Sequence, residues 1–208
     1  MLGLLRRALP IGFVLVLASA QGAMAATVNV SIMNNAFSPA TLTTIPGNTV
    51  HWTNNEISTS HTVTSDGIDA CCPNGPALFQ SGTLSPGQTF DFLFVAGGQY
   101  KYHCSIHTFM KGTVNIRIRA FPPTGGVGTT FTITWLRGGP MPNGYNEDVQ
   151  IKRPGGTFVD WKVDQTGASA TFVPDQGTGV YQFKARIQKG TSTTLVSGYS
   201  PLASITVS

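Results

Sequence analysis

The chain has 208 residues, including 24 glycines and 13 prolines, and only 11% of its residues are charged. Lysine and arginine outnumber aspartate and glutamate by 13 to 9, and no basic patch with interleaved aromatic residues appears, which excludes nucleic acid as a partner. No stretch shows a sustained helical period, whereas Val, Thr, Ile and Phe dominate the periodic segments. We therefore predict an all-β protein, and its length favours two domains over one small sandwich.

Residues 1–25 have the pattern of a secretory signal peptide. Arg6 and Arg7 precede an apolar run from Ala8 to Ala18, and Ala23-Met24-Ala25 offers the small residues that signal peptidase requires. The alternative is a membrane anchor, but the run is shorter than the ~20 residues that cross a bilayer. We expect cleavage after Ala25, export to the periplasm or the outside of the cell, and no membrane span afterwards. The chain that remains after cleavage would contain eleven basic and nine acidic residues.

Residues 26–119 alternate between strand and turn patterns. Aromatic side chains occupy every second position from Phe90 to Phe94 and again at Tyr100 and Tyr102, with the pair Gly97-Gly98 between the two runs. Alternation of this kind is typical of strands, and paired glycines are typical of the turn that joins them. The pattern predicts a strand pair that ends at Cys104.

Cys104, His107 and Met110 follow this strand pair with two residues between each and the next. A thiolate, an imidazole and a thioether are donors that copper prefers, and a second imidazole completes the donor set of a blue-copper site. His61 is the candidate for that place, because it lies where a polar loop meets the strand that begins at Thr62. The alternative is a packed cysteine, a surface histidine and a gap-filling methionine. The donor set favours the metal site.

Several fragments along residues 27–117 resemble those of the cupredoxins, the small blue-copper electron carriers, and the ligand loop is most similar to that of the amicyanins. The fragments, in the order and spacing of the family, are Phe37–Leu42, Pro46–Asn54, His61–Val63, Ser81–Gly87 and Met110–Val114. The resemblance implies a Greek-key β-sandwich over residues 26–119. It also implies one type 1 copper ion per chain, held by His61, Cys104, His107 and Met110.

The resemblance has functional implications as well. In cupredoxins the histidine of the ligand loop reaches the surface through an apolar patch and passes the electron, so redox proteins are expected to dock near His107. Ile106 and Phe109 are candidates for the patch; Phe37 is a candidate for either the patch or the core. A closed set of four ligands leaves no position for a substrate, which argues against an enzyme.

Three features depart from the family pattern. Thr62 stands where most cupredoxins have asparagine, which leaves the hydrogen bonding to the cysteine sulfur open. His103 lies beside Cys104, as the bridging histidine does in copper nitrite reductases, but a position outside the copper site is the favoured interpretation. Cys71 and Cys72 are adjacent; a strained ring, two free thiols and a bond to another chain all remain open.

The C-terminal part has a different all-β pattern. We interpret residues 120–126 as a linker and residues 127–208 as an immunoglobulin-like β-sandwich. This part resembles a fibronectin type III domain, with a core tryptophan at Trp135, Tyr181 in the penultimate strand and Ser197–Pro201 before the last strand. It contains no cysteine or histidine. A spacer, a docking surface, or contact with protein or carbohydrate remain open.

The hypothesis that follows is an exported blue copper protein that carries single electrons between redox partners. One alternative is a copper storage or delivery protein with the same ligands. Another is a surface adhesion protein in which the copper fold serves only as structure.

Overall fold

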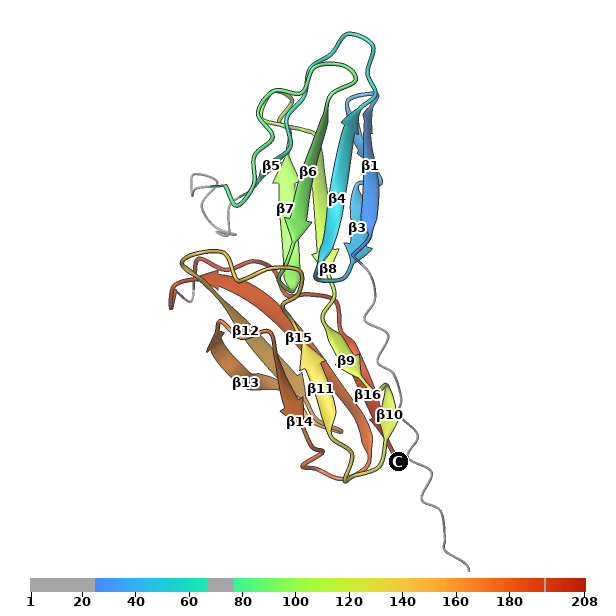
Figure 1. Cartoon of the computed structure of the whole chain (residues 1–208), viewed down its shortest axis with the longest axis vertical. Helices are drawn as coiled ribbons and strands as arrows, with labels where there is room; N and C mark the ends of the chain where they lie inside the picture. Colours follow the sequence, from blue (N-terminus) through green and yellow to red (C-terminus); the bar gives the residue numbers. More distant parts are fainter. Residues whose placement is uncertain (1–24, 67–76, 193) are drawn as a thin grey trace, which may run out of the picture.

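The computed structural model describes residues 25–66, 77–192 and 194–208, which form two β-sandwiches stacked end to end (Figure 1). Every regular element in these residues is a strand, so the all-β prediction is confirmed. No helix in the described part of the chain is long and apolar enough to cross a membrane. The residue pair Cys71-Cys72 and residues 1–24, nearly all of the leader predicted at residues 1–25, lie outside the described residues.

The N-terminal sandwich consists of two four-stranded sheets, in the orders β2-β1-β4-β6 and β3-β8-β7-β5. Its strands are β1 (Thr27–Met33), β2 (Ala36–Ser38), β3 (Thr41–Thr44), β4 (Asn48–Asn54), β5 (Thr64–Ser65), β6 (Thr89–Phe94), β7 (Gly98–His103) and β8 (Lys111–Ile116). β1 runs parallel to β4, and β6 runs antiparallel to β4. Because β1 and β4 are parallel, Met33 and Asn54 end at the same pole of the sandwich.

The core of this sandwich is built around Trp52, which is fully buried in β4. Its ring centroid lies 5.5 Å from that of Tyr102, 5.7 Å from that of Phe90 and 5.9 Å from that of Phe79. Alternate residues of a strand point to opposite faces, so the period-two aromatic residues of β6 and β7 bring their rings to this centre. The result is a rigid support for the loops at the pole.

The C-terminal sandwich packs a three-stranded sheet, β14-β11-β9, against a five-stranded sheet, β10-β16-β15-β12-β13. Its strands are β9 (Arg119–Phe121), β10 (Thr124–Gly125), β11 (Phe131–Thr134), β12 (Tyr145–Lys152), β13 (Phe158–Gln165), β14 (Ser169–Phe172), β15 (Gly179–Lys189) and β16 (Ala203–Val207). The Tyr181 hydroxyl donates to the Gly177 carbonyl at 2.9 Å and accepts from the Gln176 amide at 2.9 Å. These two bonds tie the Tyr181 side chain to the backbone of the turn that precedes β15.

The segment predicted as a linker, residues 120–126, contains most of β9 and all of β10. β9 pairs with β11, and β10 pairs with β16, so the segment is built into the second sandwich. Its prolines and glycines indicated a connector, but both residue types also occur in short edge strands, where few ladder hydrogen bonds are needed. The chain therefore passes from β8 into the second sandwich with almost no free connection.

Candidate metal centre

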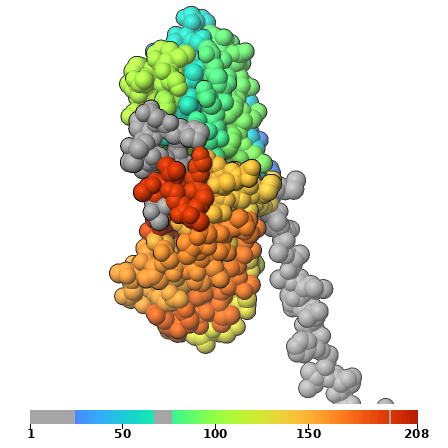
Figure 2. Space-filling view, turned by 90° about the vertical axis from the view of Figure 1, so that its left-hand side faces the viewer, coloured from blue at the N-terminus to red at the C-terminus, as the bar shows by residue number. Residues whose placement is uncertain are grey.

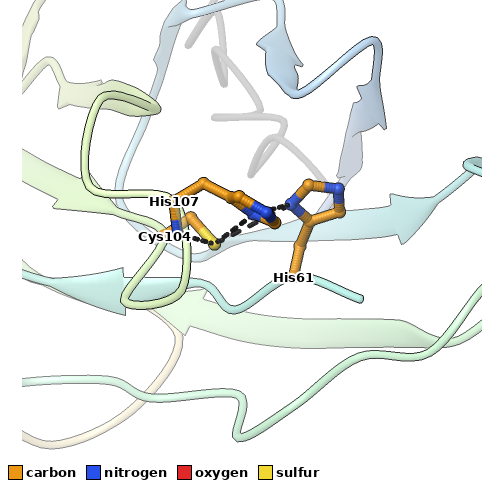
Figure 3. Close-up of side chains that lie close together, drawn as sticks. All are labelled: His61, Cys104 and His107. Carbon is orange, nitrogen blue, oxygen red and sulfur yellow. Dashed lines mark hydrogen bonds between the residues drawn. The ribbon is translucent and has the colours of Figure 1, made fainter. Parts of the chain in front are cut away.

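His61, Cys104 and His107 come from two segments that meet at one pole of the N-terminal sandwich. His61 exchanges two backbone hydrogen bonds with Leu84: its amide donates at 3.0 Å, and its carbonyl accepts at 2.7 Å. Cys104 directly follows β7. The two segments therefore hold the side chains from opposite sides of the site (Figure 3).

The loop from Cys104 to Met110 is closed by its own backbone. The Cys104 amide donates to the Met110 carbonyl at 3.1 Å, and the Met110 amide donates to the His107 carbonyl at 2.9 Å. The loop then continues directly into β8. Met110 is 2% exposed, so its thioether is directed away from solvent. These bonds hold the two ends of the loop together.

The three donor atoms lie close together. The Cys104 Sγ lies 3.8 Å from the Nδ1 of His61 and 3.8 Å from the Nδ1 of His107, and the two Nδ1 atoms are 3.1 Å apart. His61 and Cys104 are fully buried, and His107 is half-buried. Among the described residues this is the single group of histidine, cysteine or acidic side chains that converges in this way.

These distances fit one metal ion. For bonds of about 2.0 Å to nitrogen and about 2.3 Å to sulfur, they correspond to two N–metal–S angles of about 125° and one N–metal–N angle of about 100°. The three donors could therefore bind the same ion together. A trigonal arrangement of two imidazoles and one thiolate is the geometry that copper takes in electron-transfer sites.

The surroundings of His61 favour the neutral form of its imidazole, which is the form that binds a metal. Its burial, and next the neighbouring His107, lower the pKa of His61, while the Glu56 carboxylate raises it in part. A lowered pKa keeps the ring neutral at neutral pH, so that its Nδ1 lone pair is available. The Nε2 atom is buried without a hydrogen-bond partner in the described residues and lies 3.8 Å from the Glu56 Oε1.

Glu56 was missed by the sequence analysis. Its carboxylate accepts from the Asn35 amide at 2.8 Å, and its own amide donates to the Asn54 side chain at 3.1 Å. These bonds hold the carboxylate beside His61. A single glutamate in a polar loop has no periodicity or spacing that indicates such a role.

Thr62 supports the sulfur although it replaces the usual asparagine. Its amide donates to the Cys104 Sγ at 3.3 Å, and the His107 amide donates to the same sulfur at 3.4 Å. The Thr62 hydroxyl accepts from the Ser105 amide at 2.7 Å. The backbone thus provides the bond to the sulfur, and the side chain ties the two segments of the site together.

His103 points elsewhere. Its Nδ1 lies 2.5 Å from a carboxylate oxygen of Asp66, and it takes no part in the donor cluster. This agrees with its predicted position outside the site.

The surface around His107 is apolar. Phe109 is 70% exposed and Ile106 is 49% exposed, and both flank His107 in the ligand loop. Ile57, which is 96% exposed, belongs to the loop that leads to His61 and was not predicted. Phe37, for which either location was open, is 4% exposed and packs edge-on against Tyr102 at 4.7 Å, so it belongs to the core.

The fold and the donor set define a copper-binding β-sandwich. In agreement with this, residues 24–117 match the family model described as copper binding proteins, plastocyanin/azurin family. These residues therefore form a cupredoxin domain, and its cofactor is copper.

Solved structures of copper proteins are similar to part of the chain. A purple cupredoxin from Nitrosopumilus maritimus is 34% identical, over 42% of this chain and 97% of that one, with a TM-score of 0.36. A reduced amicyanin variant is 26% identical over 42% and 79%, with a TM-score of 0.37. A copper-containing nitrite reductase from Thermus scotoductus is 26% identical over 43% and 22%, with a TM-score of 0.37.

Proposed function

We propose that this protein carries single electrons through one copper ion held by His61, Cys104, His107 and Met110. The observation that supports the proposal most directly is the convergence of two Nδ1 atoms and one Sγ within 3.8 Å of one another, in a nearly trigonal arrangement. Copper in such a site supplies a reversible one-electron redox couple. Met110, buried in the same closed loop, is the proposed fourth donor, and its thioether would bind copper weakly.

The protein residues keep the site the same in both oxidation states. Backbone hydrogen bonds fix His61 against Leu84 and close the loop from Cys104 to Met110. Two amides donate to the Cys104 sulfur and fix its position. Burial of His61 and Cys104 excludes water, so little has to rearrange when an electron arrives or leaves.

Electrons would pass through the half-buried ring of His107, the most exposed of the three converging donors. The exposed side chains of Ile106 and Phe109 beside it would form the docking surface for a redox protein partner. The only acidic residue in the loop before His61 is Glu56, and it is held inward by its bonds to the backbone. A partner with a complementary apolar surface is therefore proposed.

We further propose that the chain is exported, on the strength of the leader pattern at residues 1–25, and that the C-terminal sandwich acts as a spacer or docking module. With four donors assigned to one ion, no coordination position is left for a substrate. This supports a carrier rather than a freestanding enzyme.

The test is a visible absorption spectrum of the copper-loaded full chain. A carrier of this type should show an intense thiolate-to-copper charge-transfer band that disappears on reduction and returns on oxidation. Cys104→Ala should abolish the band, whereas Ser105→Ala, a matched change of the neighbouring residue, should keep it. A colourless copper complex of the unmodified chain would contradict the proposal; rapid loss of copper to a mild chelator would favour storage or delivery instead.

A further inference from the structure

The two sandwiches are joined by backbone hydrogen bonds as well as by side chains. The turn between β6 and β7, together with the first residues of β7, inserts between two segments of the C-terminal sandwich. The Gly97 amide donates to the Trp135 carbonyl at 2.9 Å, and the Arg137 amide donates to the Val95 carbonyl at 2.8 Å. On the other side Gln99 and Gly198 exchange amide bonds of 2.8 and 3.2 Å. We call this contact the seam; it lies at the pole opposite the copper site (Figures 1 and 2).

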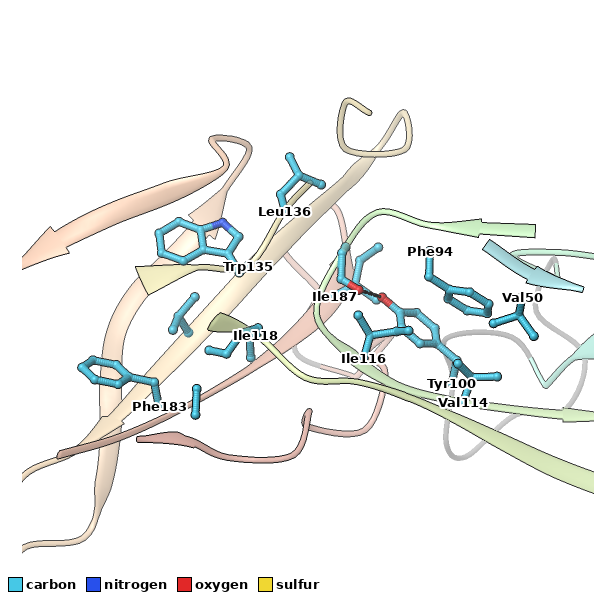
Figure 4. Packing of buried hydrophobic residues seen from close by; sticks show 14 of the residues in the cluster. Val50, Phe94, Tyr100, Val114, Ile116, Ile118, Trp135, Leu136, Phe183 and Ile187 are labelled. Carbon is cyan, nitrogen blue, oxygen red and sulfur yellow. Dashed lines mark hydrogen bonds between the residues drawn. The ribbon is translucent and has the colours of Figure 1, made fainter. Parts of the chain in front are cut away.

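The seam is closely packed. A Cβ atom on Gly97 would lie 2.4 Å from the Cγ2 of Ile118 and 2.8 Å from the Oε1 of Glu147. A Cβ atom on Gly138 would lie 2.7 Å from the Cα of Gly47, across the same boundary. Apolar side chains from both sandwiches continue across it as one buried cluster (Figure 4). A side chain at Gly97 or Gly138 would therefore collide with the opposite side of the seam.

Glu147 is an ionisable side chain buried in the middle of this apolar contact. It lies on β12 of the C-terminal sandwich, is 0% exposed, and reaches Gly97 of the N-terminal sandwich. Neither of its carboxylate oxygens has a hydrogen-bond partner among the described residues. A buried carboxylate without a partner is costly, so the group is expected to remain neutral while the seam is closed.

The groups that surround Glu147 offer it no compensating positive charge. The Tyr100 hydroxyl, from β7, donates to the Ala96 carbonyl at 2.9 Å. On its own strand the neighbour is Asp148, which is paired with Arg186 of β15 at 3.3 Å. Arg137 has a buried Nη1 of its own without a partner, and no ion pair joins it to Glu147 in the described residues.

The remaining charged neighbours are also engaged or directed elsewhere. On β13, Asp164 accepts from the Gln188 side chain, and Gln165 is the uncharged residue paired with Glu147. Arg117 and Arg119, on either side of Ile118, line a surface groove together with Leu202, and no ion pair joins either of them to Glu147 in the described residues. Desolvation, and next the charge of Asp148, raise the pKa of Glu147 well above its usual value, and the nearby Gly97 amide offsets this only in part.

We propose that Glu147 is a proton-dependent lock between the two sandwiches: the neutral carboxyl group lets the seam close, and release of its proton to water loosens the seam. The folded state binds this proton more tightly than the unfolded chain does. Stabilisation of the closed seam is therefore complete at pH values below the pKa in the unfolded chain, and it is lost as the pH rises through the pKa in the folded one. This inference does not depend on the copper or on electron transfer.

The test is amide hydrogen exchange of the copper-loaded full chain between about pH 5 and pH 9, with rates corrected for the intrinsic pH dependence of exchange. Protection of the seam amides of Gly97, Gln99 and Arg137 should fall with rising pH by at least about tenfold, while amides of β4 keep their protection. Glu147→Gln should remove this dependence, and the matched change of an exposed carboxylate, Asp160→Asn, should preserve it. Equal protection at all pH values in the unmodified chain, or an unchanged dependence in Glu147→Gln, would overturn the proposal.

A second measurement covers the case in which Glu147→Gln does not fold. Titration of carboxyl carbon signals by NMR in the unmodified chain should show one glutamate with a midpoint far above those of the other acidic residues. Normal midpoints for every glutamate would overturn the proposal. The visible absorption band of the copper site reports separately on the proposed electron-transfer function, so failure of one proposal is distinguishable from failure of the other.

Discussion

Thr62 shows how a residue that departs from its family pattern can still serve the site. Its backbone amide contacts the Cys104 sulfur, and its hydroxyl accepts from the Ser105 amide at 2.7 Å. The first contact is independent of the side chain, and the second is not.

Thr62→Val should therefore keep the visible absorption band of the copper site but destabilise the chain. Valine has the same shape but no acceptor, so the Ser105 amide loses a partly buried bond, at a cost of about 1–2 kcal/mol. Chemical denaturation measures this loss, with Thr43→Val on the exposed face of β3 as the control. An unchanged free energy of unfolding would show that the hydroxyl does not tie the two segments together.

Glu56 is a second single residue that affects the site, and it does so through its negative charge. Its carboxylate lies 3.8 Å from the Nε2 of His61 and is 17% exposed, so solvent screens it only in part. A nearby negative charge favours the more highly charged, oxidised copper.

Glu56→Gln retains an acceptor for the Asn35 amide and removes the charge. We expect the reduction potential to rise by tens of millivolts, the equivalent of about 1 kcal/mol at a partly screened distance of this size. Voltammetry of the copper-loaded chain measures the shift. Asp91→Asn, on an exposed side chain of β6, should leave the potential within a few millivolts, and a fall in the Glu56→Gln potential would refute the assignment.

At the scale of elements, the regular patterns were predictable and the long-range contacts were not. Period-two alternation correctly indicated β6 and β7, and the spacing of donors indicated the ligand loop, because both depend on neighbours in sequence. Phe79 lies in a stretch without periodicity, yet it is 4% exposed and stacks on Trp52. The pairing of β9 with β11 was hidden by the proline- and glycine-rich composition of residues 120–126.

The ligand loop presents Phe109 and Ile106 on either side of His107, and this surface can be tested without a known partner. If electrons leave through this surface as proposed, two copies of the chain would exchange electrons through it, and the self-exchange rate, measured by NMR line broadening in mixed oxidation states, would report on docking. Phe109→Glu should lower that rate by about tenfold or more and make it rise with salt, because like charges then repel across the contact.

The control for the ligand loop is Val163→Glu, which places the same charge on a 49% exposed side chain of β13 in the other sandwich. It should leave the self-exchange rate nearly unchanged. Equal effects of the two variants would mean that electrons do not leave through the apolar surface around His107.

For the whole molecule, the seam decides whether the two sandwiches behave as one unit. Residue patterns indicated two domains and a linker, but nothing in the sequence around Gly97 and Gly98 distinguishes a hairpin turn from a docking contact. The backbone bonds to Trp135, Arg137 and Gly198 predict that both sandwiches unfold together.

Gly97→Ala tests this coupling with the smallest change available. A methyl group at Gly97 would overlap the Ile118 side chain, at 2.4 Å, and would meet Glu147, so the seam must open or shift at a cost of about 1–3 kcal/mol. Calorimetry of the unmodified chain should show one transition, and Gly97→Ala should separate it into two. Gly128→Ala, where a Cβ atom meets nothing within 4 Å, should keep the single transition. Two transitions in the unmodified chain would mean that the sandwiches are independent, and the copper pole would then have no fixed orientation relative to the C-terminal module.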